Sequence, residues 1–447
     1  MGGNCTCPVG ESACGGTCVN DQTDPTHCGE ACTACVAGAT CTSGVCGCPA
    51  TAPLLCSSGC VNEQTDPNNC GGCATTPPLM GETCQGGAYA CPVGETACGT
   101  ACANTQTDAN NCGGCRISCG GTCSYGRCLV TLASGQNPRS IATDGTNVYW
   151  ANAGTNGTLM KCAVGGCGGA PTMLATTAQS LGSAIALDGT SVYWANDGPP
   201  NGGAYGMSAV MSVPLGGGTL VTIASGRDQP YGIAVNGANV YWTDSVDGTV
   251  MKCPVGGCGG GSLAVECVNA VGHTSCTFYL GDYSPWAIAV DATSVYWTSP
   301  IGDNVSSTVV KCALGGCSGP GPLGTPVVLA SGQTDYDSVA VDSTTVYWGA
   351  QAPSGGVMSV PLGGGTPNTL APGYTGQNSI AADGTTVYWA GGGNGMNGTV
   401  MKVPIGGLPD GGAPTTLATG QAALGIAVDA TSVYWANGGT IVKLTPK

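Results

Sequence analysis

The tripeptide Val-Tyr-Trp recurs seven times between Val148 and Trp435 and constrains the fold more than any other feature of the chain. Its tryptophans follow one another at similar intervals, at Trp150, Trp194, Trp242, Trp297, Trp348, Trp389 and Trp435. Seven copies of one unit at this period predict a radial repeat architecture, because each copy forms one structural element that buries its faces against its neighbours.

Each unit contains four short runs rich in β-branched and aromatic residues, bounded by Gly, Asp, Asn or Pro, which predicts four strands. Alternation along the strand places Val and Trp on one face and Tyr on the other. Two bulky faces suit a sheet stacked between two others and favour a structural role for these rings over cofactor stacking. The last unit ends without an outer strand, whereas an outer-strand sequence at 129–134 precedes the first unit. We therefore expect an all-β, seven-bladed β-propeller over 129–447, closed by the N-terminal strand 129–134.

The unit resembles the YWTD β-propellers of lipoprotein-receptor ectodomains and related NHL-like propellers, and residues 241–244 read Tyr-Trp-Thr-Asp. The receptor propellers have six blades and this chain has seven units, so the resemblance implies the architecture and no specific partner. An acidic or amide residue precedes the tripeptide strand at one place in every unit, namely Asp144, Asp188, Asn236, Asp291, Asp342, Asp383 and Asp429. We interpret these residues as Asx turns and not as a ring of metal ligands.

The segment 1–128 carries 23 of the 31 cysteines and few long aliphatic residues, so disulfides must stabilise it. Three tandem copies of Cys-x3-Cys-x9-Cys predict small modules at 7–47, 48–90 and 91–128, after the remnant of a preceding module at 1–6. The pattern resembles the stigma-specific cysteine-rich repeat, which also occurs in surface proteins of myxobacteria and their relatives. Zinc is the alternative, but cysteine separations of three, four and nine with one nearby histidine, His27, fit disulfides better.

Paired losses of cysteines between copies predict which of them are bonded. The middle module lacks the counterparts of Cys35 and Cys46 together, and Tyr89 stands at the second place. Three propeller hairpins carry both cysteines of Lys-Cys-x-x-Gly-Gly-Cys and the others carry neither, which indicates local bridges. The expected bridges are Cys35–Cys46, Cys119–Cys128, Cys162–Cys167, Cys253–Cys258, Cys267–Cys276 (around the one large insertion) and Cys312–Cys317.

Cysteine usage on this scale requires an oxidising compartment, so we expect an extracellular or cell-surface protein. The start of the chain lacks a signal peptide, and Cys5 lies outside all three modules, so we expect a longer precursor. No apolar stretch is long enough to span a membrane. The net charge of −15 argues against nucleic acid or anionic lipid as a partner. Five of the six lysines recur at one third-strand place as a scaffold feature, namely Lys161, Lys252, Lys311, Lys402 and Lys443.

Nothing in the sequence indicates catalysis, a cofactor or a metal, since it has no nucleophile elbow, no Walker loop and no paired histidines. The copies differ most in their outer-to-inner connections, where aromatic residues lie beside Asp, Asn and Gln, as is typical of glycan or peptide recognition. The candidate ligand-binding residues there are Arg139, Arg227, Asp228, Tyr231, Tyr283, Trp286, Asp335, Tyr336, Asp337, Tyr374 and Gln377. Tyr205 is added from the long loop 196–208 between second and third strands, which we expect to open on the same face.

These observations predict a secreted or surface-attached, non-enzymatic binding protein. Its propeller face would recognise an extracellular protein or glycan, and its cysteine-rich array would be a stiff spacer. Aromatic residues that only plug the channel mouth are the structural alternative for the candidate site. Two other functions stay open: a subunit of an extracellular filament or coat that binds copies of itself, and a lyase or hydrolase that uses His273, the one histidine of the propeller.

Overall fold

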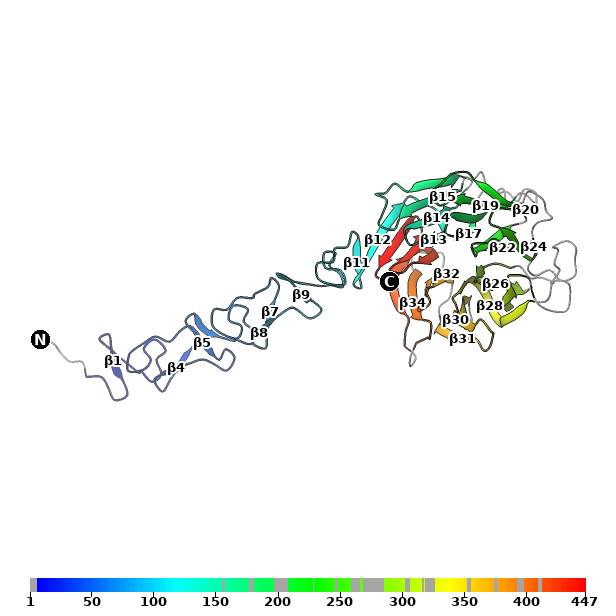
Figure 1. Ribbon diagram of the computed structural model, residues 1–447. Helices are drawn as coiled ribbons and strands as arrows, with labels where there is room; N and C mark the ends of the chain where they lie inside the picture. The colour runs from blue at the N-terminus through cyan, green and yellow to red at the C-terminus, as the bar shows by residue number, and fades with distance from the viewer. Residues whose placement is uncertain are drawn as a thin grey trace. The chain divides into compact units, whose positions relative to one another are not determined.

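The computed structural model forms two compact units, Met1–Cys119 and Gly120–Lys447 (Figure 1). It describes residues 6–154, 157–176, 181–196, 208–227, 229–245, 248–258, 266–267, 285–301, 306–315, 317, 326–351, 355–373, 377–391, 398–408 and 412–447. All regular elements in these ranges are β-strands. Within them, no segment forms a helix that is long and apolar enough to cross a bilayer.

Short hairpins and a sulfur-rich core build the first unit. The hairpins pair β1 (Ser12–Cys14) with β2 (Thr17–Val19), β3 (Thr40–Thr42) with β4 (Val45–Gly47), β5 (Leu54–Cys56) with β6 (Gly59–Val61), β7 (Thr83–Gln85) with β8 (Ala88–Ala90), and β9 (Thr96–Cys98) with β10 (Ala101–Ala103). Its bridges include Cys7–Cys18, Cys14–Cys32, Cys28–Cys41, Cys35–Cys46, Cys48–Cys60, Cys56–Cys73, Cys70–Cys84, Cys91–Cys102 and Cys98–Cys115. Each of these bridges closes within one of the three sequence modules.

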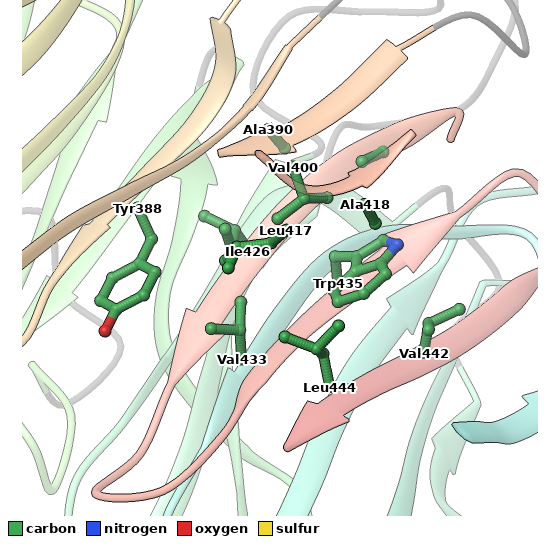
Figure 2. Close-up of a cluster of buried hydrophobic side chains, with 11 residues drawn as sticks. Tyr388, Ala390, Val400, Leu417, Ala418, Ile426, Val433, Trp435, Val442 and Leu444 are labelled. Atoms are coloured by element: carbon green, nitrogen blue, oxygen red, sulfur yellow. The ribbon is translucent and has the colours of Figure 1, made fainter. Parts of the chain in front are cut away.

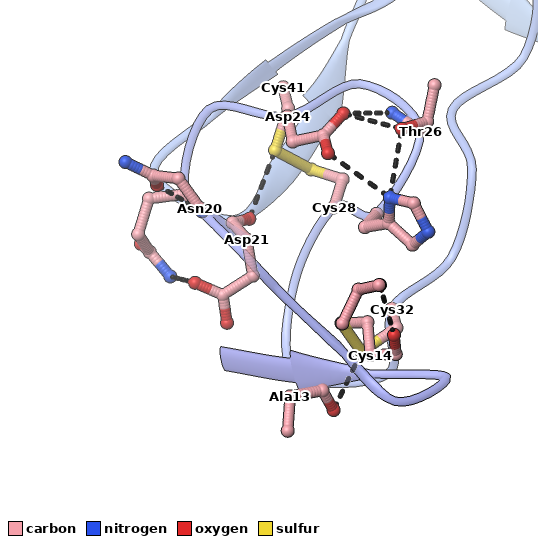
Figure 3. A network of polar contacts seen from close by, with 12 residues as sticks. Ala13, Cys14, Asn20, Asp21, Asp24, Thr26, Cys28, Cys32 and Cys41 are labelled. Atoms are coloured by element: carbon pink, nitrogen blue, oxygen red, sulfur yellow. Dashed lines mark hydrogen bonds and ion pairs between the residues drawn. A yellow bond between two sulfur atoms is a disulfide. The ribbon is translucent and has the colours of Figure 1, made fainter. Parts of the chain in front are cut away.

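Figure 3 shows this construction in the first module, where two bridges bracket a polar turn. The Asp24 carboxylate accepts hydrogen bonds from the backbone N–H of Thr26 at 2.8 Å and from its hydroxyl at 2.6 Å. The same turn recurs at Asp66 and Asp108, whose carboxylates accept from the N–H two residues later. The recurrent Gln-Thr-Asp sequence therefore marks an Asx turn.

The middle module has a tyrosine where the first module has one half of the Cys35–Cys46 bridge. Tyr89 stands where Cys46 does in the first module, and its hydroxyl donates to the carbonyl of Pro67 at 2.8 Å and lies 3.2 Å from the Thr75 hydroxyl. A hydrogen bond thus takes the place of a covalent link. Cys119 and Cys128 are both disulfide-bonded.

Main-chain hydrogen bonds also join adjacent modules. The N–H of Cys60 donates to the carbonyl of Ala37 at 2.9 Å, and the N–H of Cys102 donates to the carbonyl of Met80 at 2.8 Å. In the second joint, Met80 N–H returns a bond to Thr100 at 2.9 Å. The same hairpin thus receives the same loop of the preceding module at both joints.

Seven blades build the second unit, each with strands ordered from inner to outer. Blade 1 contains β13 (Pro138–Thr143), β14 (Asn147–Asn152), β15 (Thr158–Ala163) and β16 (Thr172–Thr176); blade 2 contains β17 (Leu181–Leu187), β18 (Ser191–Asn196), β19 (Ser208–Pro214) and β20 (Val221–Arg227). Blade 3 contains β21 (Pro230–Val235), β22 (Asn239–Asp244), β23 (Thr249–Pro254) and β24 (Glu266–Cys267); blade 4 contains β25 (Ile288–Val290), β26 (Ser294–Ile301), β27 (Ser306–Ala313) and the first half of β28 (Val327–Val341). Blade 5 contains the second half of β28, β29 (Thr345–Gln351), β30 (Gly356–Pro361) and β31 (Asn368–Pro372); blade 6 contains β32 (Gln377–Ala382), β33 (Thr386–Gly391), β34 (Gly398–Pro404) and β35 (Thr415–Gln421).

Blade 7 combines the two ends of the propeller sequence. Its chain-terminal strands are β36 (Ala423–Val428), β37 (Val433–Asn437) and β38 (Thr440–Thr445), and its outer strand is β12 (Arg127–Ser134). β12 runs antiparallel to β38, from the pair Cys128 and Thr445 to the pair Ser134 and Thr440, and the two meet in Figure 1 as cyan beside red. β11 (Thr122–Ser124) pairs with the other edge of β12. The second unit therefore begins before β11, earlier than residue 129, because β12 is one continuous strand that starts in the cysteine-rich sequence.

The Val-Tyr-Trp strands form the core between blades. All seven valines and tyrosines of the repeat are at most 2% exposed, and the tryptophans at most 3%. Each tryptophan packs in one cluster with the tyrosine of the preceding blade, and Trp150 of blade 1 packs with Tyr434 of blade 7. Figure 2 shows the cluster of Trp435 and Tyr388 between blades 6 and 7. The two faces of each strand thus contact two different neighbours, as the alternation predicts.

The recurrent lysines hold one blade to the next. The ammonium groups of Lys161, Lys252, Lys311 and Lys443 donate to backbone carbonyls of Leu215, Leu314, Leu362 and Val164, respectively, at 2.8 to 3.3 Å. The last of these contacts runs from blade 7 to blade 1. The hairpin bridges Cys162–Cys167, Cys253–Cys258 and Cys312–Cys317 are present near these contacts, whereas Cys276 lies outside the described residues.

Candidate functional site

One position at the start of the inner strand carries a different residue in every blade, although the residue after it is always Ser, Ala or Gly. The residue paired with each repeat tryptophan is isoleucine six times and Val339 once. The residue two places earlier is different in all seven copies: Arg139, Ser183, Tyr231, Trp286, Asp337, Asn378 and Leu424. Each inner strand contacts the next, and β36 contacts β13. We call these seven positions the variable ring.

A break in strand pairing frees these positions from the ladder. The register between inner and second strands shifts across six of the seven, for example between Pro138 and Ser140 around Arg139, and between Ala423 and Gly425 around Leu424. The seventh, Trp286, precedes β25. A residue at such a bulge is unpaired and can point away from the sheet, which is how bulges orient side chains in binding sites.

Tyr231 and Trp286 form an aromatic pair across blades 3 and 4. Their ring centroids are 5.0 Å apart with the planes tilted by 43°, and Trp286 is 37% exposed. The main chain beneath is fixed, because the Thr243 hydroxyl donates to the Trp286 carbonyl at 2.7 Å and accepts from the N–H of Gly232 at 2.9 Å. A Cβ at position 232 would lie 2.4 Å from that carbonyl, so the close approach requires glycine.

Across the ring, Arg139 is exposed and Leu424 is 36% exposed. Gly425, which follows Leu424, lies against the main chain of the variable-ring residue of the next blade, as Gly232 does. A Cβ at Gly425 would lie 3.2 Å from the Arg139 carbonyl. Leu424 is not among the residues predicted from the sequence, because it resembles one more core aliphatic. Counting back from Trp435 by the interval that separates Trp242 from Tyr231 would have found it.

The outer-to-inner connections end beside this ring and contain Arg227. Its guanidinium lies 3.9 Å from the carboxylate of Asp244, which is fully buried at the end of β22. Pro230 pairs with Asp244, and Ser208 pairs with Arg227. The starts of inner and third strands and the ends of second and outer strands therefore meet at one end of the propeller.

Several predicted residues cannot be placed in this geometry. Tyr205, Asp228, Tyr283 and Tyr374 lie outside the described residues, as does His273. Asp335, Tyr336 and Asp337 belong to β28 and Gln377 begins β32, so their backbones lie at the same end of blades 5 and 6. Their side chains are outside the described part. Of the predicted residues, the structure brings together Tyr231 with Trp286, and it places Arg139 and Asp337 on the same ring.

The repeated acidic residues act as turn residues at the other end of the inner strand. In Asp429, one oxygen accepts from the N–H groups of Thr431 and Ser432, and the other accepts from the Tyr434 hydroxyl at 2.7 Å. Burial alone would raise the pKa of this carboxyl, but these hydrogen bonds outweigh it and hold the pKa below its usual range. The same contacts hold at Asp144, Asp188, Asp291, Asp342 and Asp383, and Asn236 accepts the two N–H bonds in blade 3.

Three cysteine sulfurs in the described residues lie close enough together to share a metal ion, but all three are in disulfides. The sulfurs of Cys28, Cys35 and Cys46 lie within 4.8 Å of one another, but Cys28 is bonded to Cys41, and Cys35 to Cys46. The disulfides also indicate an oxidising, extracellular environment. His27, in the first unit, has its ring nitrogen 3.1 Å from the Asp24 carboxylate.

Comparison with known proteins gives likeness of fold. No family model matches the sequence, and no curated protein matches it. A chain of the mitotic checkpoint complex is similar in structure, with 11% identity over 71% of this chain and 93% of that chain, and a TM-score of 0.50. A catalytically inactive virginiamycin B lyase from Staphylococcus aureus, solved with quinupristin, shares 13% identity over 71% of this chain and 99% of its own, with a TM-score of 0.49. A chain of a nidogen/laminin complex shares 14% identity over 63% of this chain and 90% of its own, with a TM-score of 0.41.

Proposed function

We propose that this chain is a secreted or surface-attached, non-enzymatic binding protein whose variable ring recognises an extracellular protein or glycan. The observation that carries the proposal is the contrast within each inner strand. The residue paired with the tryptophan is almost invariant among blades, whereas the residue two places earlier is different in all seven. Folding needs one kind of blade, so seven different side chains at one place indicate another requirement.

The chemistry of the ring supports binding. An exposed tryptophan backed by a half-buried tyrosine on a fixed main chain offers contact area that loses little conformational entropy when a partner docks. Trp, Tyr and Arg are the residues that most often dominate binding energy at interfaces. The hydrogen bonds between adjacent modules support the second part of the proposal, a spacer role for the cysteine-rich array.

A pull-down from extracellular material combined with an oligosaccharide array, both with the full chain, tests this function. Trp286→Ala should weaken binding by about 2 kcal/mol, or roughly 30-fold in Kd. Val328→Ala is the matched control, because Val328 is 57% exposed on an outer strand and its loss should leave affinity unchanged. Equal affinity of the two variants would refute a site on the variable ring. Self-association that Trp286→Ala does not reduce would instead favour the filament or coat subunit.

A further inference from the structure

A hydrogen-bonded latch closes the variable-ring end of blades 1 and 7. The indole N–H of Trp150 donates to the side-chain carbonyl of Gln136 at 3.1 Å, and Trp435 does the same to Gln421 at 3.0 Å. An asparagine at the end of the second strand completes each latch. Asn152 donates to Gln136 at 2.9 Å, and Asn437 accepts from the N–H after Gln421 at 2.6 Å.

Blade 3 has charged residues at both places of this latch. Gln136, Gln421 and Arg227 each directly follow a glycine with positive φ, namely Gly135, Gly420 and Gly226, so they occupy the same place. Asp244 corresponds to the asparagines, because it pairs with the first residue of its inner strand as they do. Both latch residues are thus replaced together, by an arginine and an aspartate that form an ion pair.

This replacement leaves the end of blade 3 less well satisfied than the latched ends of blades 1 and 7. The buried indole N–H of Trp242 has no hydrogen-bond partner among the described residues. The connection from outer to inner strand is also one residue longer in blade 3 than in blades 1 and 7, and Gln229 adopts a φ of 55°. An unpaired buried donor and a non-glycine residue in the left-handed region are both unfavourable, and backbone strain of this kind clusters at functional sites.

We infer that this end of blade 3 is the part of the proposed binding face that takes a neutral oligosaccharide, an inference that rests on the proposed function. Arg227 remains 14% exposed and offers donors to hydroxyl and ring oxygens. Asp244 balances its charge, so an acidic ligand gains little over a neutral one. The exposed ring of Trp286, which lies against the half-buried ring of Tyr231, presents an apolar surface for the C–H face of a sugar.

The size of the ligand follows from β22, which supports both the Tyr231–Trp286 pair and the Arg227–Asp244 ion pair. Thr243 fixes the main chain of Trp286, and the next residue, Asp244, holds Arg227. Successive side chains of a strand point to opposite faces, so the ring pair and the ion pair flank β22. A ligand that touches both must span the blade end, which favours a chain of two or more sugars over a monosaccharide.

The test restores the latch of blades 1 and 7 in the full chain with the double variant Arg227→Gln, Asp244→Asn. We expect its thermal unfolding temperature to equal or exceed that of the parent, because Trp242 regains an acceptor. Its affinity for the neutral oligosaccharides bound by the parent on an array, measured by calorimetry, should fall at least 10-fold. A lower unfolding temperature would show that the ion pair is structural and would overturn the inference, as would an unchanged affinity.

The single variant Asp244→Asn tests whether the Asp244 carboxylate offsets the charge of Arg227. It leaves Arg227 unpaired, so preference should shift at least 10-fold from neutral toward uronic-acid oligosaccharides, a change that a merely structural role does not produce. An unshifted preference would contradict the role of Asp244. If the parent binds no neutral oligosaccharide but captures a protein through Trp286, this inference is wrong and the proposed function stands.

Discussion

Replacement of Leu132 by alanine tests whether β12 closes the propeller or only rests against it. Leu132 is 4% exposed and packs with Ile141 and Trp150 of blade 1 and with Ile441 of blade 7. Leucine-to-alanine changes in well-packed cores lower the free energy of unfolding by about 2–5 kcal/mol. A middle value of about 3 kcal/mol corresponds, for a unit of this size, to a fall in Tm of about 4 °C.

Two matched variants define the result. Leu417 holds the same place in β35 of blade 6 and is fully buried, so Leu417→Ala should lower Tm by a similar amount. Thr131 precedes Leu132 in the same strand and is exposed, so Thr131→Ala should change stability by less than about 0.5 kcal/mol. Calorimetry and chemical unfolding of the full chain measure all three. If Leu132→Ala behaves like Thr131→Ala while Leu417→Ala unfolds earlier, β12 does not close the ring.

Three further outcomes are expected. Cys253 and Cys258 correspond to Val403 and Leu408 of blade 6. Replacing both cysteines by Ser should lower the free energy of unfolding by about 2 kcal/mol in chemical unfolding, from loss of the short covalent link alone. Replacing them by Val and Leu should lower it by less. Asp429 has a lowered pKa in the folded chain, so its stabilising contribution is present above the unfolded value of about 3.9 and is lost as pH falls through the folded pKa. Asp429→Asn should therefore flatten the acid limb of stability against pH, and an unchanged limb would contradict this. Lys443→Met removes the hydrogen bond to Val164 and should lower stability by about 1 kcal/mol, whereas a gain would show that burial of the ammonium outweighs the bond.

The blades could be predicted from the sequence because their signal is local and repeated. The alternation within Val-Tyr-Trp places Val240 and Trp242 on one face and Tyr241 on the other, and the structure buries these faces against two different blades. The absence of an outer strand after Leu444 indicated that another segment completes blade 7, and β12 pairs with β38 there. Both inferences need only strand period and strand count.

The start of the second unit could not be predicted in the same way. Cysteine spacing extends the third module to Cys128, but β12 begins at Arg127 and continues to Ser134 as one strand. A strand that begins in one compositional region and ends in another leaves no mark in composition. Pairing with β38, at the far end of the sequence, decides where the propeller begins.

The variable ring was only partly predictable, and the reason lies in the bulge. Aromatic residues among polar ones drew attention to Tyr231 and Trp286, but the same criterion passes over Leu424, which has ordinary core chemistry. What distinguishes Leu424 is the break in register between Ala423 and Gly425, and a break in pairing belongs to the folded sheet. The ion pair that replaces the latch in blade 3 is harder still to predict. Arg227 and Asp244 become partners only when the outer strand of one blade leads into the inner strand of the next.

The break in strand pairing also explains how six of the seven blades can carry different residues at the variable-ring position. Ile233 pairs with Trp242, and the cluster around it includes Tyr193 of the neighbouring blade, so a change there disturbs two blades at once. Tyr231 lies two residues earlier, where the ladder with β22 is interrupted, and it meets its neighbour through Trp286 alone among the ring contacts of the described residues. A substitution at this level therefore alters the surface offered to a partner without altering the pairing that holds the blade. The residue that pairs with the tryptophan and the residue of the variable ring are two positions apart in sequence, and this separation allows the ring to vary while the core repeats.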